Sequence, residues 1–247
     1  MSGHSKWATI RHKKGAADAK RGKIFTKIIK EIIVSARLGG GDIESNPRLR
    51  AAVLKARGSN MPKDNIERGI KKGTGDLEGA NYTELMYEGY ASGGVAIMVE
   101  TLTDNKNRTA ADIRSIFNKA GGSLGESGCV SYMFKKKGII ILNSETSSEE
   151  EIFELALEHG AEDVKAEDGS IEIITAPDDF ETVVQALDTT GIPYESAEVE
   201  LVADTTMTLD HEGTRKVLRL IENLEDNDDV QTVSSNLEIP EDFDVDE

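Results

Sequence analysis

The chain has 247 residues, of which 38% are hydrophobic and 30% are charged, and its formal net charge at pH 7 is −17. This length suits two or three small domains, and no run approaches the ~18 apolar residues that a membrane-spanning helix needs, so we expect no membrane protein. The N-terminal residues lack the apolar stretch of a secretory signal. The single cysteine, Cys129, cannot form an internal disulfide. Both observations predict a cytoplasmic protein.

The charge is divided unevenly along the chain. Residues 1–74 contain 18 lysines and arginines but only six acids, a net charge of +12, which leaves −29 for the remaining residues. A basic segment joined to an acidic body is typical of a polyanion-binding domain carried on a body that does not bind the polyanion itself. The alternative is a solvated basic surface that has no partner.

An amphipathic helix is predicted over residues 20–37. Apolar side chains recur there at steps of three and four from Ile24 to Ala36, which places them on one face. The three glycines at 39–41 end the helix, because glycine accepts the left-handed conformation after a helix C-terminus. Four lysines fall nearly opposite the apolar face, and we call them the lysine row: Lys20, Lys23, Lys27 and Lys30.

Two shorter helices follow in the basic segment. Asn46 is a favourable N-cap and Pro47 a favourable first helical residue, so a second helix should run from there to about Gly58. A third should begin near Pro62 and end at Gly73. Together the three predict a small helical domain.

The residues ahead of the first helix, 2–17, are basic and contain few apolar side chains, so we expect a loosely docked arm. Such an arm can fold onto a phosphate backbone, and Trp7 could stack on an exposed base. Alternatively, Trp7 anchors the arm on the helical domain. The predicted nucleic-acid-binding residues of arm and helix are Lys6, Trp7, Arg11, His12, Lys13, Lys14, Lys20, Arg21, Lys23, Lys27 and Lys30.

The acidic body begins with paired strands at 82–90 and 93–102, joined through Gly93 and Gly94. Thr109 then reads as the N-cap of a helix, with Asp112 completing a capping box. From about residue 130, strands and helices alternate in the order βαββαβ: strand 138–142, helix from Ser148, strands near Val164 and at 171–174, helix from Asp178, and a strand through Ala197 and Leu201. This order is ferredoxin-like.

A helix at 211–225 and a strand at 229–237 follow the βαββαβ module. Because strands and a helix also precede that module, we expect it to be inserted into a second, discontinuous α+β domain. The predicted fold is therefore α+β with three domains. The predicted boundaries are 1–78 for the arm and helical domain, 79–129 with 205–240 for the discontinuous domain, 130–204 for the ferredoxin-like domain, and 241–247 for an acidic tail.

Catalytic and cofactor motifs are missing from the sequence. No phosphate-binding loop, dinucleotide fingerprint or zinc-ligand spacing is present, so we expect no enzyme, cofactor, metal or small-molecule substrate. Cys129 reads as a packing residue. A secondary phosphate or RNA contact is conceivable between a strand and a helix, although local turn and capping chemistry explains the same residues: Asn105, Lys106, Asn107 and Arg108 with Asp104.

Several segments together carry a family resemblance. They are SGHSKWATIRHKK at 2–14, DAKRGK at 18–23, NMPKDNI at 60–66, YEGY at 87–90 and TDNKNRT at 103–109. This set resembles the YebC/PmpR family, and the likeness extends over essentially the whole chain. One departure is Ala91 with Ser92, where the family commonly has Gly-Pro.

The resemblance implies a three-domain cytoplasmic protein that acts as a DNA-binding transcriptional regulator. Some relatives act in translation, including a mitochondrial translational activator. We therefore expect a nucleic-acid-binding regulator that acts on DNA through its basic N-terminal domain. The alternative is a ribosome-associated translation factor that binds ribosomal or transfer RNA. The oligomeric state does not follow from the sequence.

Overall fold

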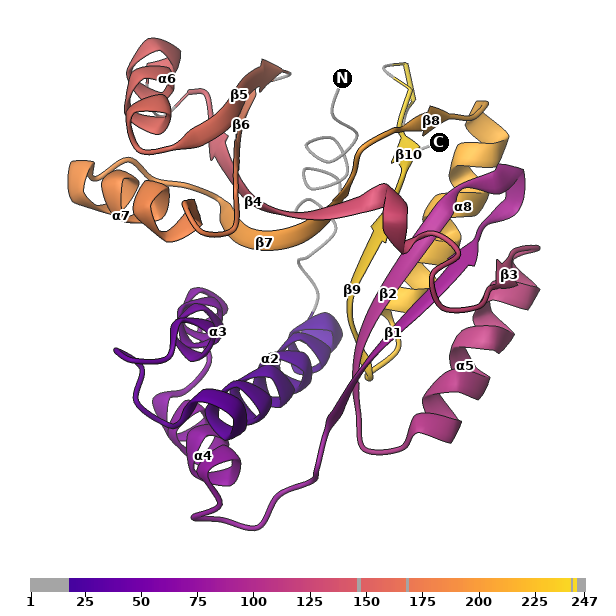
Figure 1. Ribbon diagram of the computed structural model, residues 1–247, viewed down its shortest axis with the longest axis horizontal. Coiled ribbons are helices and arrows are strands. Elements are labelled where there is room, and N and C mark those ends of the chain that lie inside the picture. Colours follow the sequence, from indigo (N-terminus) through magenta and orange to yellow (C-terminus); the bar gives the residue numbers. More distant parts are fainter. Residues whose placement is uncertain (1–17, 146–147, 168, 241, 244–247) are drawn as a thin grey trace. The chain divides into compact units, whose positions relative to one another are not determined.

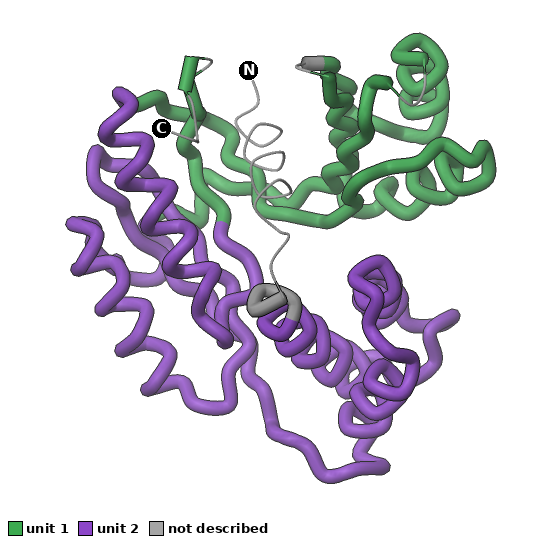
Figure 2. The backbone as a smooth tube through the Cα atoms, turned by 180° about the vertical axis from the view of Figure 1, so that it is seen from behind, with its two compact units in different colours: residues 1–11, 130–209, 234–247 green, residues 12–129, 210–233 purple. Residues whose placement is uncertain are grey.

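The computed structural model describes residues 18–145, 148–167, 169–240 and 242–243. These residues form two compact units, one made of 130–209 with the chain from 234 onward, the other of the residues up to 129 with 210–233 (Figure 2). The predicted basic arm lies outside the described residues, as do the side chains of Lys20 and Arg21. No described helix combines the length and apolar composition needed to cross a membrane.

Three helices form a small domain at the start of the second unit: α2 (Asp18–Gly39), α3 (Pro47–Gly58) and α4 (Lys63–Thr74) (Figure 1). The predicted local signals are present, since the Asn46 side chain accepts a hydrogen bond from the backbone N–H of Leu49 and Pro47 begins α3. Apolar residues of the three helices close one core around Ile32 and Leu49.

Close packing of α2 against α4 depends on Gly73. A Cβ atom at this position would lie 2.5 Å from the carbonyl oxygen of Ile33 and 2.6 Å from the Cβ of Ala36. We expect Gly73→Ala to lower the free energy of unfolding by about 1–3 kcal/mol, because the two backbones must separate. Gly22→Ala, in α2, meets nothing within 4 Å and should be neutral or slightly stabilising. Urea unfolding of both variants checks this, and equal stabilities would contradict it.

A four-stranded sheet with the order β3-β1-β2-β9 completes this unit (Figure 1). Strands β1 (Thr83–Tyr90) and β2 (Ala96–Thr103) are antiparallel and joined through the glycine turn, as predicted. Strand β3 (Ser123–Leu124) is short, and β9 (Val230–Ser235) enters from much later in the chain. Helices α5 (Lys106–Lys119) and α8 (His211–Glu225) contact each other and bury apolar side chains such as Phe117 and Leu224.

The start of α5 differs from the prediction. The helix begins at Lys106, and its N-cap is Asn105, whose side chain accepts a hydrogen bond from the backbone N–H of Arg108. Thr109 is therefore not the cap but lies in the first turn, where it is fully buried. The prediction was wrong because the short polar side chains at both positions satisfy the same local capping rule, and only the packing of the helix selects between them.

The other unit contains a ferredoxin-like module, as predicted. Its elements are β4 (Phe134–Asn143), α6 (Glu149–Glu158), β5 (Ala161–Glu167), β6 (Ser170–Thr175), α7 (Phe180–Thr190) and β7 (Ser196–Ala203). The strands form an antiparallel sheet in the order β5-β6-β4-β7. The core lies between this sheet and α6 and α7, around Ile140 and Ile173. A parallel pair, β8 (Met207–Thr208) with β10 (Leu237–Glu238), follows.

The structure is thus mixed α+β with several domains, which confirms the predicted fold class. The chain passes through α8 between β7 and β9. The β3-β1-β2-β9 sheet therefore takes its strands from before and after the ferredoxin-like module. The residue boundaries of the three domains stay a prediction.

Candidate functional site

Three lysines of the row, Lys23, Lys27 and Lys30, face a turn that connects α8 to β9. We call residues 225–229, with the sequence EDNDD, the acidic turn. The ammonium of Lys23 lies 3.1 Å from a carboxylate oxygen of Asp226, and that of Lys27 lies 2.5 Å from the carbonyl oxygen of Glu225. Both lysines therefore have partners within the protein.

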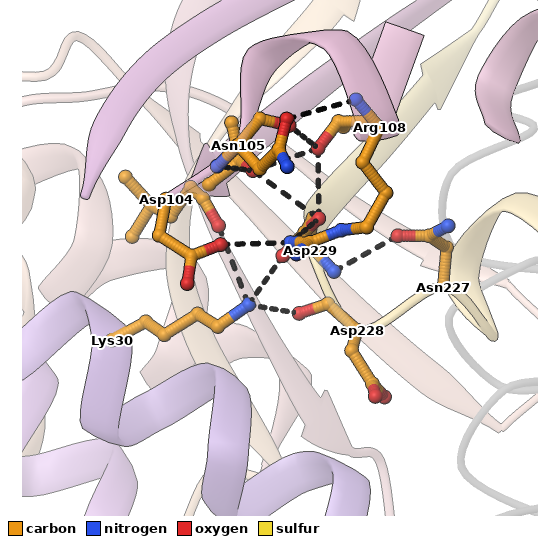
Figure 3. A network of polar contacts seen from close by, with 10 residues as sticks. Lys30, Asp104, Asn105, Arg108, Asn227, Asp228 and Asp229 are labelled. Atoms are coloured by element: carbon orange, nitrogen blue, oxygen red, sulfur yellow. Dashed lines mark hydrogen bonds and ion pairs between the residues drawn. The ribbon is translucent and has the colours of Figure 1, made fainter. Parts of the chain in front are cut away.

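Lys30, the last member of the row, is buried. Its ammonium donates to the Asp229 carboxylate and to the carbonyl oxygen of Asp228, both at 2.7 Å (Figure 3). It also lies 5.4 Å from the centre of the Tyr82 ring. Its side chain is only 8% exposed. A buried lysine that is satisfied in this way serves the structure, and a phosphate could reach it only after the turn had moved.

Asp229 is the centre of a polar network that we call the Asp229 network. Besides Lys30, its carboxylate accepts hydrogen bonds from Arg108 and Thr109, each at 2.7 Å, and from Thr103 at 3.2 Å (Figure 3). Burial disfavours the charged carboxylate. The hydrogen bonds from Arg108, Lys30 and Thr109 outweigh this effect and lower the pKa of Asp229 to about 2.

The network joins helix α2 to the sheet, because Thr103 ends β2, Arg108 and Thr109 begin α5, and Asp229 precedes β9. Sequence analysis missed Asp229, Thr103 and Thr109. For Asp229 the available signal was the run of acids directly after an amphipathic helix, which by itself indicates no more than a solvated turn, whereas Thr103 and Thr109 stood in the TDNKNRT segment without an assigned partner.

The environment of Lys27 differs from that of an exposed lysine. Burial lowers its pKa to about 8, and the negative charge of Glu225 only partly offsets this effect. Lys55 on α3 lowers it further, whereas Asp226 and Asp228 raise it. Lys27 thus lies within the field of both a neighbouring lysine and the acidic turn.

The secondary site predicted between β2 and α5 is largely engaged in local contacts. Asn105 caps α5, and the Arg108 guanidinium pairs with Asp104 at 2.9 Å as well as with Asp229. The hydrogen bond to Asp229 raises the pKa of Arg108, so this charge is permanent. Lys106 and Asn107 are exposed. A phosphate or RNA contact at these residues stays a prediction.

Other cations of the helical domain point to solvent. On α4, Arg68 and Lys71 are exposed and lie opposite the buried side that contains Ile66 and Gly69. Arg57, at the end of α3, is also exposed. Among the described residues, these three side chains have no hydrogen-bond or ion-pair partner, and we call them the outer cations.

No catalytic or metal-binding arrangement is evident in the part of the chain that the structure describes. Within it, no three His, Cys, Asp or Glu side chains come together as metal ligands would. Cys129 is half-buried, and burial together with the charge of Glu88 raises the pKa of its thiol. A raised pKa keeps the thiol protonated and weakens it as a nucleophile.

The chain is similar to known proteins over its whole length. A protein of Treponema denticola named "Probable transcriptional regulatory protein" is 62% identical over 247 residues, which are all of both chains. A protein of Geobacter sulfurreducens with a name of the same kind is 58% identical and covers 97% of this chain and 96% of its own. The crystal structure of a conserved hypothetical protein from Aquifex aeolicus superposes with a TM-score of 0.87 at 50% identity, covering 96% of this chain and 98% of that one.

Two family models match consecutive parts of the sequence. Residues 5–76 match the TACO1/YebC N-terminal domain, and residues 82–237 match the TACO1/YebC second and third domains. The first match coincides with the basic segment and its three helices, and the second contains both four-stranded sheets. The chain therefore belongs to the TACO1/YebC family.

Proposed function

We propose that this protein is a cytoplasmic, nucleic-acid-binding regulator that acts on DNA in transcription through its basic N-terminal domain. The names of the relatives point to transcriptional regulation. The observation that carries the proposal is the separation of charge, +12 over residues 1–74 against −29 elsewhere. A domain of that charge attracts a polyanion while the acidic body repels it, so the nucleic acid is directed to one part of the molecule.

The proposed interface combines the basic arm with cations of the helical domain. It keeps the arm residues Lys6, Trp7, Arg11, His12, Lys13 and Lys14, the helix residues Lys20, Arg21, Lys23 and Lys27, and adds the outer cations Arg57, Arg68 and Lys71. Lys30 is left out, because it is buried against Asp229. Contacts of this kind hold the phosphate backbone, and any sequence preference must come from side chains that reach base edges.

The outer cations give a direct test with a matched control. The test variant is Arg57→Gln/Arg68→Gln/Lys71→Gln. The control, Lys119→Gln/Lys136→Gln/Arg219→Gln, removes three exposed charges from the acidic part of the chain. Binding to a random-sequence duplex is measured by fluorescence anisotropy as a function of salt.

We expect the test variant to bind more weakly than the control and its log–log salt slope to be shallower by about 2 to 3, because each lost phosphate contact removes about 0.9 from the slope. Equal salt slopes for the two variants would show that the outer cations are not part of the interface. If the wild-type protein binds neither duplex DNA nor RNA, the proposed function itself is wrong.

A competition experiment with random-sequence duplex distinguishes a DNA-binding regulator from an RNA-binding translation factor. A transcriptional regulator should prefer its own duplex over random duplex by about 1–3 kcal/mol for each base pair that it reads. Binding to ribosomes that survives an excess of random duplex would instead favour the ribosome-associated translation factor.

A further inference from the structure

The acidic turn offers Lys23 and Lys27 oxygen acceptors of the kind that a phosphate backbone would offer them. The Lys23 ammonium donates hydrogen bonds to a carboxylate oxygen and to the carbonyl oxygen of Asp226, both at 3.1 Å, and the Lys27 ammonium donates to the carbonyl oxygen of Glu225. These carbonyls end helix α8, where the helix dipole concentrates partial negative charge. The contacts therefore pair the two ammonium groups with one carboxylate oxygen and two carbonyl oxygens of partial negative charge, positions that phosphate oxygens would take in a complex.

We propose that residues 225–227 of the acidic turn are an internal competitor, which covers Lys23 and Lys27 in the unbound protein and is displaced when nucleic acid binds to these two lysines. This inference rests on the proposed function and adds a regulatory step to it. The nucleic acid gains the two lysines only by moving residues 225–227 away from α2.

The contacts differ in strength along the row, which makes partial release feasible. The Lys23–Asp226 pair is open to solvent, with side chains 44% and 67% exposed, and such pairs contribute little to stability. The Lys30–Asp229 pair at the other end is buried and belongs to the Asp229 network. Residues 225–227 can therefore separate from Lys23 and Lys27 while Lys30, held by Asp228 and Asp229, keeps α2 attached to the sheet.

The arrangement also explains how an acidic body can be compatible with a polyanion. With the turn in place, Glu225, Asp226 and Asp228 act on Lys27 and reduce the positive field of this face of α2. Only a ligand with several closely spaced anionic groups can compensate for the loss of these contacts. The turn should thus favour an extended phosphate backbone over single anions.

A pair of variants with the same change in net charge tests the proposal. The released variant, Glu225→Gln/Asp226→Asn/Asp228→Asn, neutralises the acids that act on Lys27 and leaves Asp229 intact. The control, Asp112→Asn/Glu126→Gln/Glu212→Gln, neutralises three exposed acids of the same unit that have no recorded contact with α2. The probes are a random 20-base-pair duplex and a single-stranded RNA of the same length.

We expect the released variant to bind the duplex several-fold more tightly than the control, because the nucleic acid no longer has to displace acids that compete for Lys23 and Lys27. Adding Lys23→Gln and Lys27→Gln to the released variant should abolish this gain. Released and control variants with equal affinities would overturn the inference while leaving the proposed function intact. If neither the variants nor the wild-type protein bind either probe, both this inference and the proposed function are wrong.

Amide hydrogen exchange of the wild-type protein gives an independent readout. Saturating duplex or RNA should accelerate exchange at the amides of residues 225–227, since these residues leave α2. Exchange at 102–109, which the Asp229 network holds, should stay as slow as in the unbound protein. Unchanged or slower exchange in the acidic turn upon binding would contradict the displacement.

Discussion

Asp229→Ala is expected to lower the free energy of unfolding by about 3–5 kcal/mol, because it removes one partner of a buried ion pair and leaves the other charge uncompensated. Lys30 would remain in a buried position with only carbonyl acceptors, and Thr109 would lose the carboxylate to which it donates. Urea unfolding at pH 7, followed by far-ultraviolet circular dichroism, measures the change.

The control for this prediction is Asp226→Ala, which breaks the exposed pair with Lys23 and should cost less than about 1 kcal/mol. A double-mutant cycle then isolates the buried pair. Lys30→Met and Asp229→Ala should be non-additive by at least about 1 kcal/mol, since the two side chains are in direct contact. Additive losses would show that the pair is not coupled and would contradict the role given to Asp229.

Stability should also fall in acid because of Asp229. Its pKa is about 2 in the folded protein, well below that of a free aspartate, so the unfolded chain binds the proton first as the pH falls. The contribution is fully present above about pH 5, decreases as the pH falls below the unfolded value, and is lost once the pH passes below about 2. A shift of this size corresponds to roughly 2–3 kcal/mol.

The comparison with Asp229→Asn separates this contribution from those of the many other carboxylates. The difference in unfolding free energy between wild type and Asp229→Asn should be constant from pH 7 to pH 5 and decrease between pH 5 and pH 2. Glu212→Gln, at an exposed pair on α8, provides the control and should track the wild type. A difference that stays constant down to pH 2 would mean that the Asp229 network does not lower the pKa of this carboxyl group.

Much of the architecture was predictable because its determinants are local. The capping of α3 by Asn46 involves groups three residues apart, and the apolar face of α2 follows from helical periodicity. The order of strands and helices between residues 130 and 204 restricted the topology to the ferredoxin-like arrangement. In each case the signal and the structure that it specifies lie in the same stretch of sequence.

The candidate site depended on contacts that are distant in sequence. The sequence by itself determined that α2 carries four lysines on one side, because spacing fixes direction on a helix. Only the tertiary structure decided what those lysines meet: Lys30 pairs with a residue 199 positions away, and Thr109 donates to the same carboxylate across 120 positions. Periodicity determines which way a side chain points, whereas the partner of that side chain depends on how separate elements pack. For this reason the same row of lysines has an exposed ion pair at Lys23 and a buried ion pair at Lys30.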